Sequence, residues 1–367
     1  MAITHLKIEG FRSLKSIEWS PARLNVLIGP NGSGKSNLLR ALQLLQRAAN
    51  GKLNDAVLSS GGMGSLAWDS RVRDIFWRVS LEDRQIYELT LERIGTSAEY
   101  AISHEALRGP HEGFTRRPGR VILHDPFSEF ALRSENETAL YQLINDEAIR
   151  AIGERIGGIA VFHDLDVRQG SALRQAAIAR REATLAPDGQ NLVPVLHTLY
   201  TTDRRFKETL NDAMQTAFGR EFEELIFPPA ADQRIDMRIR WRSLHAEQST
   251  ANLSDGTLRF LMLIAILGAP GTGELIAIDE PELGLHPHML PIIAELARQV
   301  SERTQVIFTT HSPQFLDAFA EPPVTTVVTL ENGESKLETL SGKELAVWLE
   351  RYTLGELFRS GELEAMV

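Results

Sequence analysis

Residues 24–37 have the sequence LNVLIGPNGSGKSN, in which an apolar run leads into a glycine-rich loop and then into a lysine and a serine. The run at 24–28 is typical of a short strand that is buried on both faces. From Lys35 to about Ala49, apolar residues recur three and four positions apart, which predicts a helix ending at the Asn-Gly pair 50–51. The stretch therefore predicts an α/β fold with a strand, a tight loop and a helix at its centre.

The loop matches the pattern G-x-x-x-x-G-K-S from Gly29 to Ser36. Backbone N–H groups can wrap closely around phosphate oxygens where residues lack a Cβ, and the helix N-terminus adds partial positive charge. Lys35 adds a formal charge near the β- and γ-phosphates, and the Ser36 hydroxyl can bind Mg²⁺. The alternative is a flexible glycine loop with an unrelated lysine. We predict that ATP and Mg²⁺ bind here, at Asn31, Gly32, Ser33, Gly34, Lys35, Ser36 and Asn37.

A second apolar run, at 275–278, ends in the acids Asp279 and Glu280. Ligands of α/β sheets bind at the carboxyl ends of the strands, so these carboxylates are expected near the phosphate loop. We predict that Asp279 binds the metal and that Glu280 orients or deprotonates the attacking water. Taken alone the pattern is weak, because strands often end in acids.

A polar turn with the sequence NLSDGT precedes the apolar residues 258–267. Ser254 is a good helix N-cap, and a capped helix is the simpler interpretation. The functional interpretation is that Ser254, Asp255 and Gly256 present a helix N-terminus to the γ-phosphate held by another subunit.

The strand predicted at 305–309 leads to a histidine, His311. A lone histidine is usually structural. This one follows a strand next to two predicted site strands, so we predict that His311 contacts the γ-phosphate or positions water.

The elements suggest three parts. Residues 1–127 are rich in strands, including a pair at 74–80 and 86–94, and are expected to form the first part of an ATP-binding head with an antiparallel β subdomain. Residues 128–230 follow a helical pattern and are expected to form an inserted lobe. Residues 231–367 complete the head, because helix and strand patterns alternate from 252 to 311.

Composition narrows the function classes. The chain has 367 residues, with 49 acidic against 39 basic residues and a net charge of −10, so nucleic acid could be bound only through local patches. The absence of cysteine excludes disulfides, thiolate metal sites and thiol nucleophiles. No membrane span or secretion signal is recognisable, so we expect a cytoplasmic protein without a membrane partner.

Together the four motifs resemble ABC-type ATPases of the RecF/SMC/OLD branch, in the same order along the chain. The opening LKIEGFRSL at 6–14 and the segment DEPELGLHP at 279–287 match that branch closely. The resemblance implies a P-loop NTPase head with a mixed sheet that forms a homodimer across ATP and Mg²⁺. In it, Lys35 of one subunit faces Ser254 of the other, Glu280 is the catalytic glutamate and His311 the switch histidine.

Spacing and absences refine the resemblance. About 220 residues separate Lys35 from Ser254, more than a transporter subunit uses, which is consistent with a second lobe. Too little chain follows His311 for the nuclease domain of OLD proteins, and no long heptad run indicates a coiled-coil arm. Asp255 replaces the glycine of the transporter signature. The sensing glutamine is either Gln142 or Gln169.

Weaker features have simple alternatives. Residues 234–242 alternate arginines with apolar residues, which predicts a strand whose arginine face is solvated or contacts phosphates. The arginine-rich loop at 116–120 is either a DNA contact or a surface turn. The HDLD sequence at 163–166 could hold a metal, although no second cluster supports this. Residues 354–363 are expected to pack on the head itself rather than on a partner.

Two roles remain open. The first is a DNA-associated clamp in repair or genome maintenance. The second is a sensor ATPase that gates a separate effector protein, such as a nuclease in anti-phage defence. A transport motor is unsupported, because the insertion is long and no membrane segment is present.

Overall fold

The computed structural model describes residues 2–70, 72–95, 99–110, 113–124, 128–271, 273–340, 345, 348, 349 and 351–365. Residue 127, the predicted end of the first part, lies outside this set. The strand–loop–helix prediction is confirmed: β3 spans Leu24–Ile28 and α1 spans Lys35–Ala49.

A central sheet of six strands has the order β10-β17-β18-β3-β19-β20. All neighbours are parallel except β19 and β20. Apart from β3, its strands are β10 (Ile159–Phe162), β17 (Leu275–Asp279), β18 (Gln305–Thr309), β19 (Val324–Glu331) and β20 (Glu334–Thr339). Val26 and Ile28 pack into the core on one side of the sheet, and Leu27 packs into the core on the other. The sheet is therefore buried on both faces, as the apolar runs predicted.

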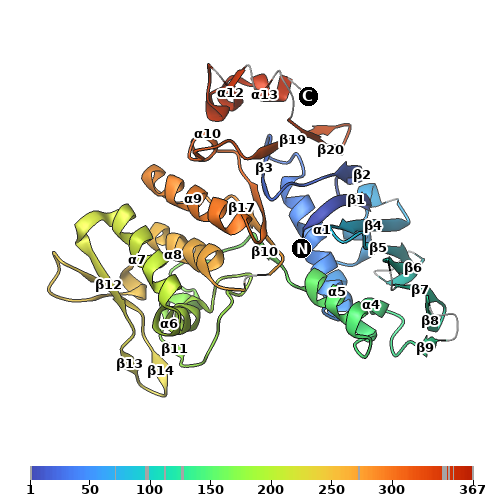
Figure 1. Ribbon diagram of the computed structural model, residues 1–367, viewed down its shortest axis with the longest axis horizontal. Coiled ribbons are helices and arrows are strands. Elements are labelled where there is room, and N and C mark those ends of the chain that lie inside the picture. Colours follow the sequence, from blue (N-terminus) through green and yellow to red (C-terminus); the bar gives the residue numbers. More distant parts are fainter. Residues whose placement is uncertain are drawn as a thin grey trace.

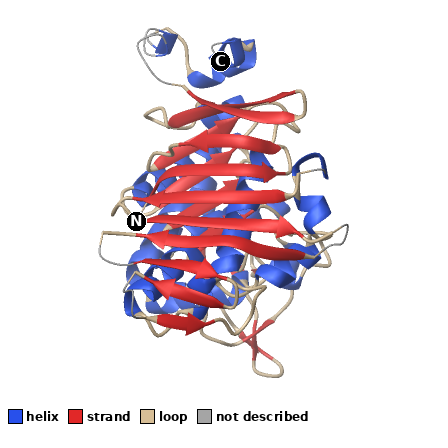
Figure 2. Cartoon of the chain, turned by 90° about the vertical axis from the view of Figure 1, so that its right-hand side faces the viewer, coloured by secondary structure: helices blue, strands red, loops and turns tan. Residues whose placement is uncertain are grey.

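The second sheet is antiparallel, and its strands lie side by side in Figure 2. Its order is β2-β1-β4-β5-β6-β7-β8-β9, with β1 at Ile3–Phe11, β2 at Leu14–Trp19, β4 at Asp74–Leu81, β5 at Ile86–Arg93, β6 at Tyr100–Arg108, β7 at Gly113–Arg117, β8 at Arg120–Leu123 and β9 at Glu129–Ala131. One core fills the space between this sheet, α1 and the central sheet. The short helices α2 (Leu53–Ser59) and α3 (Met63–Leu66) follow α1. The predicted mixed α/β head with an N-terminal antiparallel subdomain is confirmed.

On its other face the central sheet is covered by helices α6 (Leu192–Thr202), α7 (Arg204–Phe218), α8 (Asp255–Gly268) and α9 (Leu290–Ser301). α8 lies at the centre of this layer and is apolar and buried on nearly all sides. Figure 1 shows this helical side at the left and the antiparallel sheet at the right, with the central sheet between them.

The segment 128–230 is less uniform than predicted. Its first helices, α4 (Ala139–Gln142) and α5 (Glu147–Gly157), pack on α1 rather than in a separate lobe. The next element, β10, pairs in parallel with β17 and is the edge strand of the central sheet. Its apolar residues IAVF follow directly after α5, so the sequence showed only a continuation of the helical pattern.

The single strand predicted at 234–242 is wrong. β14 (Arg234–Ile235) pairs with β11 (Ala177–Ile178) and β13 (Pro229–Ala230), while β15 (Arg238–Trp241) pairs with β12 (Phe222–Ile226) and β16 (Gln248–Ser249). The predicted alternation holds, because Ile235, Met237 and Ile239 are buried. Arg238 and Arg240 form ion pairs with neighbouring acids, so these two arginines of that face are neutralised.

The C-terminal segment packs on the head, as expected. Leu354 and Leu357 of α12 (Leu354–Ser360) and Leu363 of α13 (Glu362–Ala365) are buried in the core that contains α9 and α10 (Pro313–Leu316). In the part of the chain that the structure describes, every helix is too short or too polar to cross a membrane.

Candidate functional site

The phosphate loop is held from behind by the hairpin β19–β20. A Cβ on Gly29 would lie 2.1 Å from the carbonyl oxygen of Val328, and a Cβ on Gly34 would lie 2.0 Å from Ser335 Oγ. Both glycines also have positive φ angles, 139° and 108°. Their lack of a side chain is therefore required by packing as well as by backbone conformation. Gly32, with φ 81°, is at the open side of the loop, since a Cβ added there would meet no atom within 4 Å.

Polar side chains fix the shape of the loop. Lys35 Nζ donates hydrogen bonds to the carbonyl oxygens of Gly29, at 2.7 Å, and Pro30, at 3.0 Å. Ser335 Oγ donates to the carbonyl oxygen of Ser33, at 2.6 Å. The Ser33 hydroxyl is buried and has no hydrogen-bond partner within the described chain. A glycine cradle, a helix N-terminus, a lysine and a spare hydroxyl suit the phosphates of a nucleotide.

The strand register brings the predicted site residues to one edge of the sheet. Asp279, the last residue of β17, is paired with Thr309 of β18, and Thr309 is paired with Leu27 of β3, just before the phosphate loop. Thr309 Oγ1 also donates a hydrogen bond to Asp279 Oδ1. Asp279 is thus held in the same row of residues from which the phosphate loop begins, where a metal next to the phosphates would need a ligand.

Glu280 has an unusual backbone conformation. Its φ is 47°, in the left-handed region that non-glycine residues rarely adopt. The backbone N–H donates to Thr309 O at 3.1 Å and lies 3.2 Å from Thr309 Oγ1, which holds the turn in place. The Glu280 side chain then lies with Oε1 3.1 Å from His311 Nδ1. Strained backbone of this kind is often found at functional sites. Here it directs the partly exposed carboxylate of Glu280 toward the partly exposed ring of His311.

A second acid, Glu282, lies close by in a drier environment. Its Oε1 accepts a hydrogen bond from Thr310 Oγ1, and its Oε2 is buried without a partner within the described residues. Burial raises the pKa of Glu282, and the Thr310 hydrogen bond offsets this only in part. The motif therefore holds two carboxyl groups in different environments, one of them partly exposed beside His311.

Ser254 caps α8, so the simpler interpretation of this serine is confirmed. Its Oγ accepts a hydrogen bond from the N–H of Thr257 at 3.1 Å and lies 2.8 Å from Thr257 Oγ1. The turn also packs tightly on the loop that follows β17, since a Cβ on Gly256 would lie 2.6 Å from the carbonyl oxygen of Gly284. Helix start and acidic loop are therefore in direct contact.

Arg174 is a residue that the sequence did not reveal. Its guanidinium is buried and donates to the carbonyl oxygens of Val167, at 2.8 Å, and Leu253, at 2.8 Å. It also donates longer hydrogen bonds to the carbonyl oxygens of Thr250 and Ala251 in the same turn. In addition, it forms an ion pair with Asp255. Arg174 thus ties the turn that precedes α8 to the loop that follows β10. No periodic pattern surrounds Arg174 in the sequence, so nothing marked it in advance.

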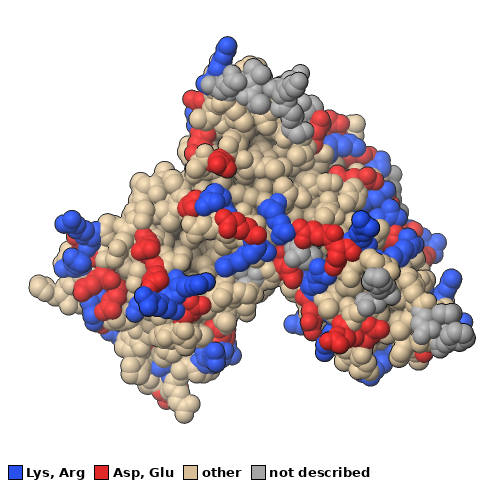
Figure 3. Space-filling model, viewed as in Figure 1, with Lys and Arg blue, Asp and Glu red and all other residues tan. Residues whose placement is uncertain are grey.

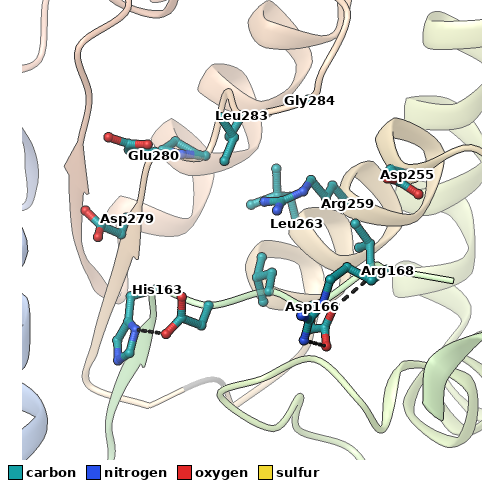
Figure 4. A pocket seen from close by; sticks show the side chains of 14 residues that line it. His163, Asp166, Arg168, Asp255, Arg259, Leu263, Asp279, Glu280, Leu283 and Gly284 are labelled. Carbon is teal, nitrogen blue, oxygen red and sulfur yellow. Dashed lines mark hydrogen bonds and ion pairs between the residues drawn. The ribbon is translucent and has the colours of Figure 1, made fainter. Parts of the chain in front are cut away.

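A pocket of about 830 Å³ lies where these elements meet (Figure 4). Figure 4 shows Arg259 of α8 projecting into it between Asp279 and Glu280 on one side and Asp255 on the other. Burial lowers the pKa of Arg259, while Asp255 and Asp166 act in the opposite direction. Hydrogen bonds from Arg168 lower the pKa of Asp166 to about 2. The pocket therefore combines fixed charges of both signs.

Several weaker predictions fail on geometry. Both ends of the Gln142 amide are bonded to the loop at 133–138, so Gln142 is not part of this site. Gln169 follows Arg168 but does not line the pocket. His163 bonds to Gln43 and Asp164, and no group of three or more potential metal ligands occurs in the described chain. The metal hypothesis for 163–166 therefore has no support among the described residues.

Arg116 is also not a DNA contact. Its side chain is buried and paired with the fully buried Glu105, at 3.2 Å. It also donates to the carbonyl oxygens of Glu135 and Glu137. The arginine-rich segment is thus partly a structural anchor, because β7 places Arg116 on its inner face.

Known proteins similar to this chain were found by sequence and by fold. The curated relatives include three proteins named "DNA replication and repair protein RecF". The one from Symbiobacterium thermophilum is 25% identical over 338 residues, covering 82% of this chain and 89% of that protein. Those from Stutzerimonas stutzeri and Nitrosococcus oceani are 46% and 38% identical over 132 and 77 residues, which is 33% and 21% of their own length.

Solved structures show the same fold. An SMC head bound to the C-terminal winged-helix domain of ScpA matches 95% of this chain and 100% of its own, with a TM-score of 0.61 and 15% identity. A second structure, an SMC head with an extended coiled coil bound to the C-terminal domain of ScpA derived from Pyrococcus furiosus, matches 95% of this chain and 98% of its own. The TM-score is 0.55 and the sequence identity is 12%. Residues 24–317 match the family described as "AAA domain, putative AbiEii toxin, Type IV TA system". The chain therefore belongs to this family of AAA domains and is an ABC-type ATPase head of the RecF/SMC branch.

Proposed function

We propose that this chain binds ATP with Mg²⁺ and hydrolyses it. The observation that carries the proposal is the arrangement at the carboxyl edge of the central sheet, where Glu280 faces His311 in the row that also holds Asp279 and the start of the phosphate loop. Membership of an ATPase family supports it.

Each residue has a defined task in this proposal. Residues 31–37 would surround the phosphates, and Lys35 would exchange its bonds to the carbonyl oxygens of Gly29 and Pro30 for bonds to phosphate oxygens. Ser36 and Asp279 would hold the metal. When bound, Mg-ATP supplies an electrophilic terminal phosphate whose negative charge the metal offsets. Glu280 accepts the proton of a water molecule, and His311 Nδ1 keeps the Glu280 carboxylate in place.

We further propose a homodimer in which Ser254, Asp255 and Gly256 of one subunit cover the nucleotide of the other. The exposed position of Ser254 and Asp255 at the start of α8 supports this. Size-exclusion chromatography with light scattering tests it. ATP should convert monomers to dimers in wild type, and the conversion should fail in Lys35→Ala.

For the biological role we propose a DNA-associated clamp in repair or genome maintenance, supported by the name of the RecF relatives. Acidic and basic side chains are mixed over the face drawn in Figure 3, which fits contacts through small patches. The description of the matched family names a putative toxin of a Type IV TA system. As a second candidate we propose a regulatory ATPase that gates a separate effector in a defence system.

A DNA shift assay with and without ATP separates the two roles. A clamp should retain duplex DNA only with ATP and should release it as salt rises. An effector gate needs no DNA binding of its own. The absence of any ATP-dependent shift at low salt would contradict the clamp.

A further inference from the structure

A second cavity, of about 330 Å³, lies along α1 beyond the phosphate loop. We call it the arginine pocket, after Arg12, Arg40 and Arg47 in its wall. Arg40 and Arg47 are seven positions apart on α1 and share one face of the helix. Arg12 reaches the cavity from the turn between β1 and β2. The wall is completed by residues of α1, α2 and the end of β10, among them Gln43, Ser59, Ser60 and His163.

The three guanidinium groups have no counter-ion among the described residues. Within that part of the chain, their side chains form no hydrogen bond and no ion pair. The Arg12 Nε atom is buried without a partner there. Burial lowers the pKa of Arg12, and the positive charge of Arg40 lowers it further. Some other partly buried arginines of this acidic chain are neutralised, as Arg155 is by Asp83. Arg12 and Arg40, which is itself exposed, repel each other, and Arg47 lines the same cavity. Unpaired cations gathered on the wall of one cavity indicate that the cavity suits an anion.

None of the residues that line the pocket belongs to the phosphate loop, although Arg12 is next to Ser13, whose Oγ accepts a hydrogen bond from Asn37 Nδ2. At about 1.5 Å of rise per residue, Arg40 and Arg47 lie roughly 8 and 18 Å along α1 from Lys35. The volume is that of a site for a small molecule, whereas a nucleic acid strand would lie across the surface. His163 lines this pocket and also the pocket that contains Asp279 and Glu280. An occupant would therefore share one wall with the catalytic acids.

We propose that the arginine pocket binds the phosphate groups of a small, soluble phosphorylated ligand. Guanidinium groups hold phosphate oxygens through paired, charge-assisted hydrogen bonds, and a bound phosphate would satisfy the buried Arg12 Nε. The proposal does not depend on ATP hydrolysis by the chain.

The test uses the full chain with the substitution Lys35→Ala, which weakens phosphate binding in the loop. Pyrophosphate and adenosine monophosphate are titrated separately by calorimetry at low salt. Pyrophosphate should bind, and Arg40→Ala or Arg47→Ala should weaken it about tenfold or more. Tighter binding of the monophosphate would identify a nucleotide as the source of the phosphate. Arg303→Ala, at an exposed arginine just after α9, is the charge-matched control and should change nothing.

Stability provides an independent readout. Arg40→Ala removes a repulsion with Arg12, so the variant without ligand should unfold at the same or a higher temperature than its parent while it loses binding. The proposal is overturned if pyrophosphate and the monophosphate both fail to bind, or if binding survives both arginine substitutions. It is also overturned if a short single-stranded DNA binds through Arg40 and Arg47 while the small phosphates do not.

Discussion

Glu280 Oε1 lies 3.1 Å from His311 Nδ1, although the two residues follow different strands of the central sheet. Thr309 makes this contact possible. It precedes His311 by two positions, and its carbonyl and hydroxyl oxygens both hold the backbone N–H of Glu280 in a turn with positive φ. One threonine thus positions the carboxylate, the neighbouring Asp279 and the start of the histidine segment together.

Glu280→Gln should abolish turnover without loss of ATP binding. The amide cannot accept a proton from water, so hydrolysis should fall at least about 100-fold. Dimers should then accumulate in ATP, because the nucleotide that joins them is no longer consumed. Steady-state phosphate release and light scattering measure both effects. Glu302→Gln, at an exposed glutamate just after α9, is the control. Unchanged turnover in Glu280→Gln contradicts the assigned role.

Ser254→Ala removes both the helix cap and the proposed contact in the second subunit. Loss of the cap alone should cost about 1 kcal/mol of stability. Asp203→Ala removes the cap of α7, where Asp203 Oδ1 accepts from Phe206 N at 3.0 Å, and serves as the matched control. We expect both variants to lose similar stability, while only Ser254→Ala loses hydrolysis with ATP affinity retained by the monomer. Equal activity in the two variants would leave Ser254 as a cap and nothing more.

Arg174→Met should disorder the turn that leads into α8. The substitution leaves the buried carbonyl oxygens of Val167 and Leu253 unpaired, which should cost about 2–4 kcal/mol. Chemical denaturation measures the loss. Asp255→Asn removes the ion pair alone, and since Asp255 is exposed it should cost far less. If Asp255→Asn proves equally damaging, the ion pair rather than the carbonyl contacts holds the turn.

Gly34→Ala should destabilise the folded protein more than Gly32→Ala does. Both positions have positive φ, which costs an alanine roughly 1–2 kcal/mol. At Gly34 the added Cβ also meets Ser335 Oγ at 2.0 Å, whereas at Gly32 it meets nothing. Thermal unfolding compares the variants, and Gly34→Ala with Ser335→Gly should recover part of the difference. Equal melting temperatures for the two single variants would show that the β19–β20 hairpin moves to accommodate the added Cβ at no cost in stability.

Glu282→Gln should stabilise the protein increasingly as pH rises. The folded-state pKa of Glu282 is raised above 4.5, so the folded chain holds this proton more tightly than the unfolded chain. Wild type therefore loses stability as pH increases from about 4.5 through the folded pKa, whereas the neutral amide does not titrate. Melting temperatures at pH 4.5, 6 and 8 measure the divergence. If the difference in melting temperature between Glu282→Gln and wild type is the same at all three pH values, Glu282 is not a buried group that titrates in this range.

Much of the site could be predicted from the sequence, because its residues lie in short motifs that directly follow apolar runs. The phosphate loop, the acids after β17 and His311 each follow an apolar run whose length and periodicity specify a parallel strand. Parallel strands present their carboxyl ends at one edge, so these patterns also implied that the motifs meet. The structure brings Glu280 next to His311 at that edge, a contact that the sequence analysis did not specify.

The sequence by itself determined the chain order of these motifs and the periodicity of the elements that carry them, because both depend on neighbours within one strand or helix turn. Only the tertiary structure decided that Arg174 holds the turn before α8, that Ser335 packs behind the phosphate loop, and that Arg12, Arg40 and Arg47 line one cavity. Those contacts join side chains brought together by packing, and packing depends on three-dimensional shape that no local pattern encodes.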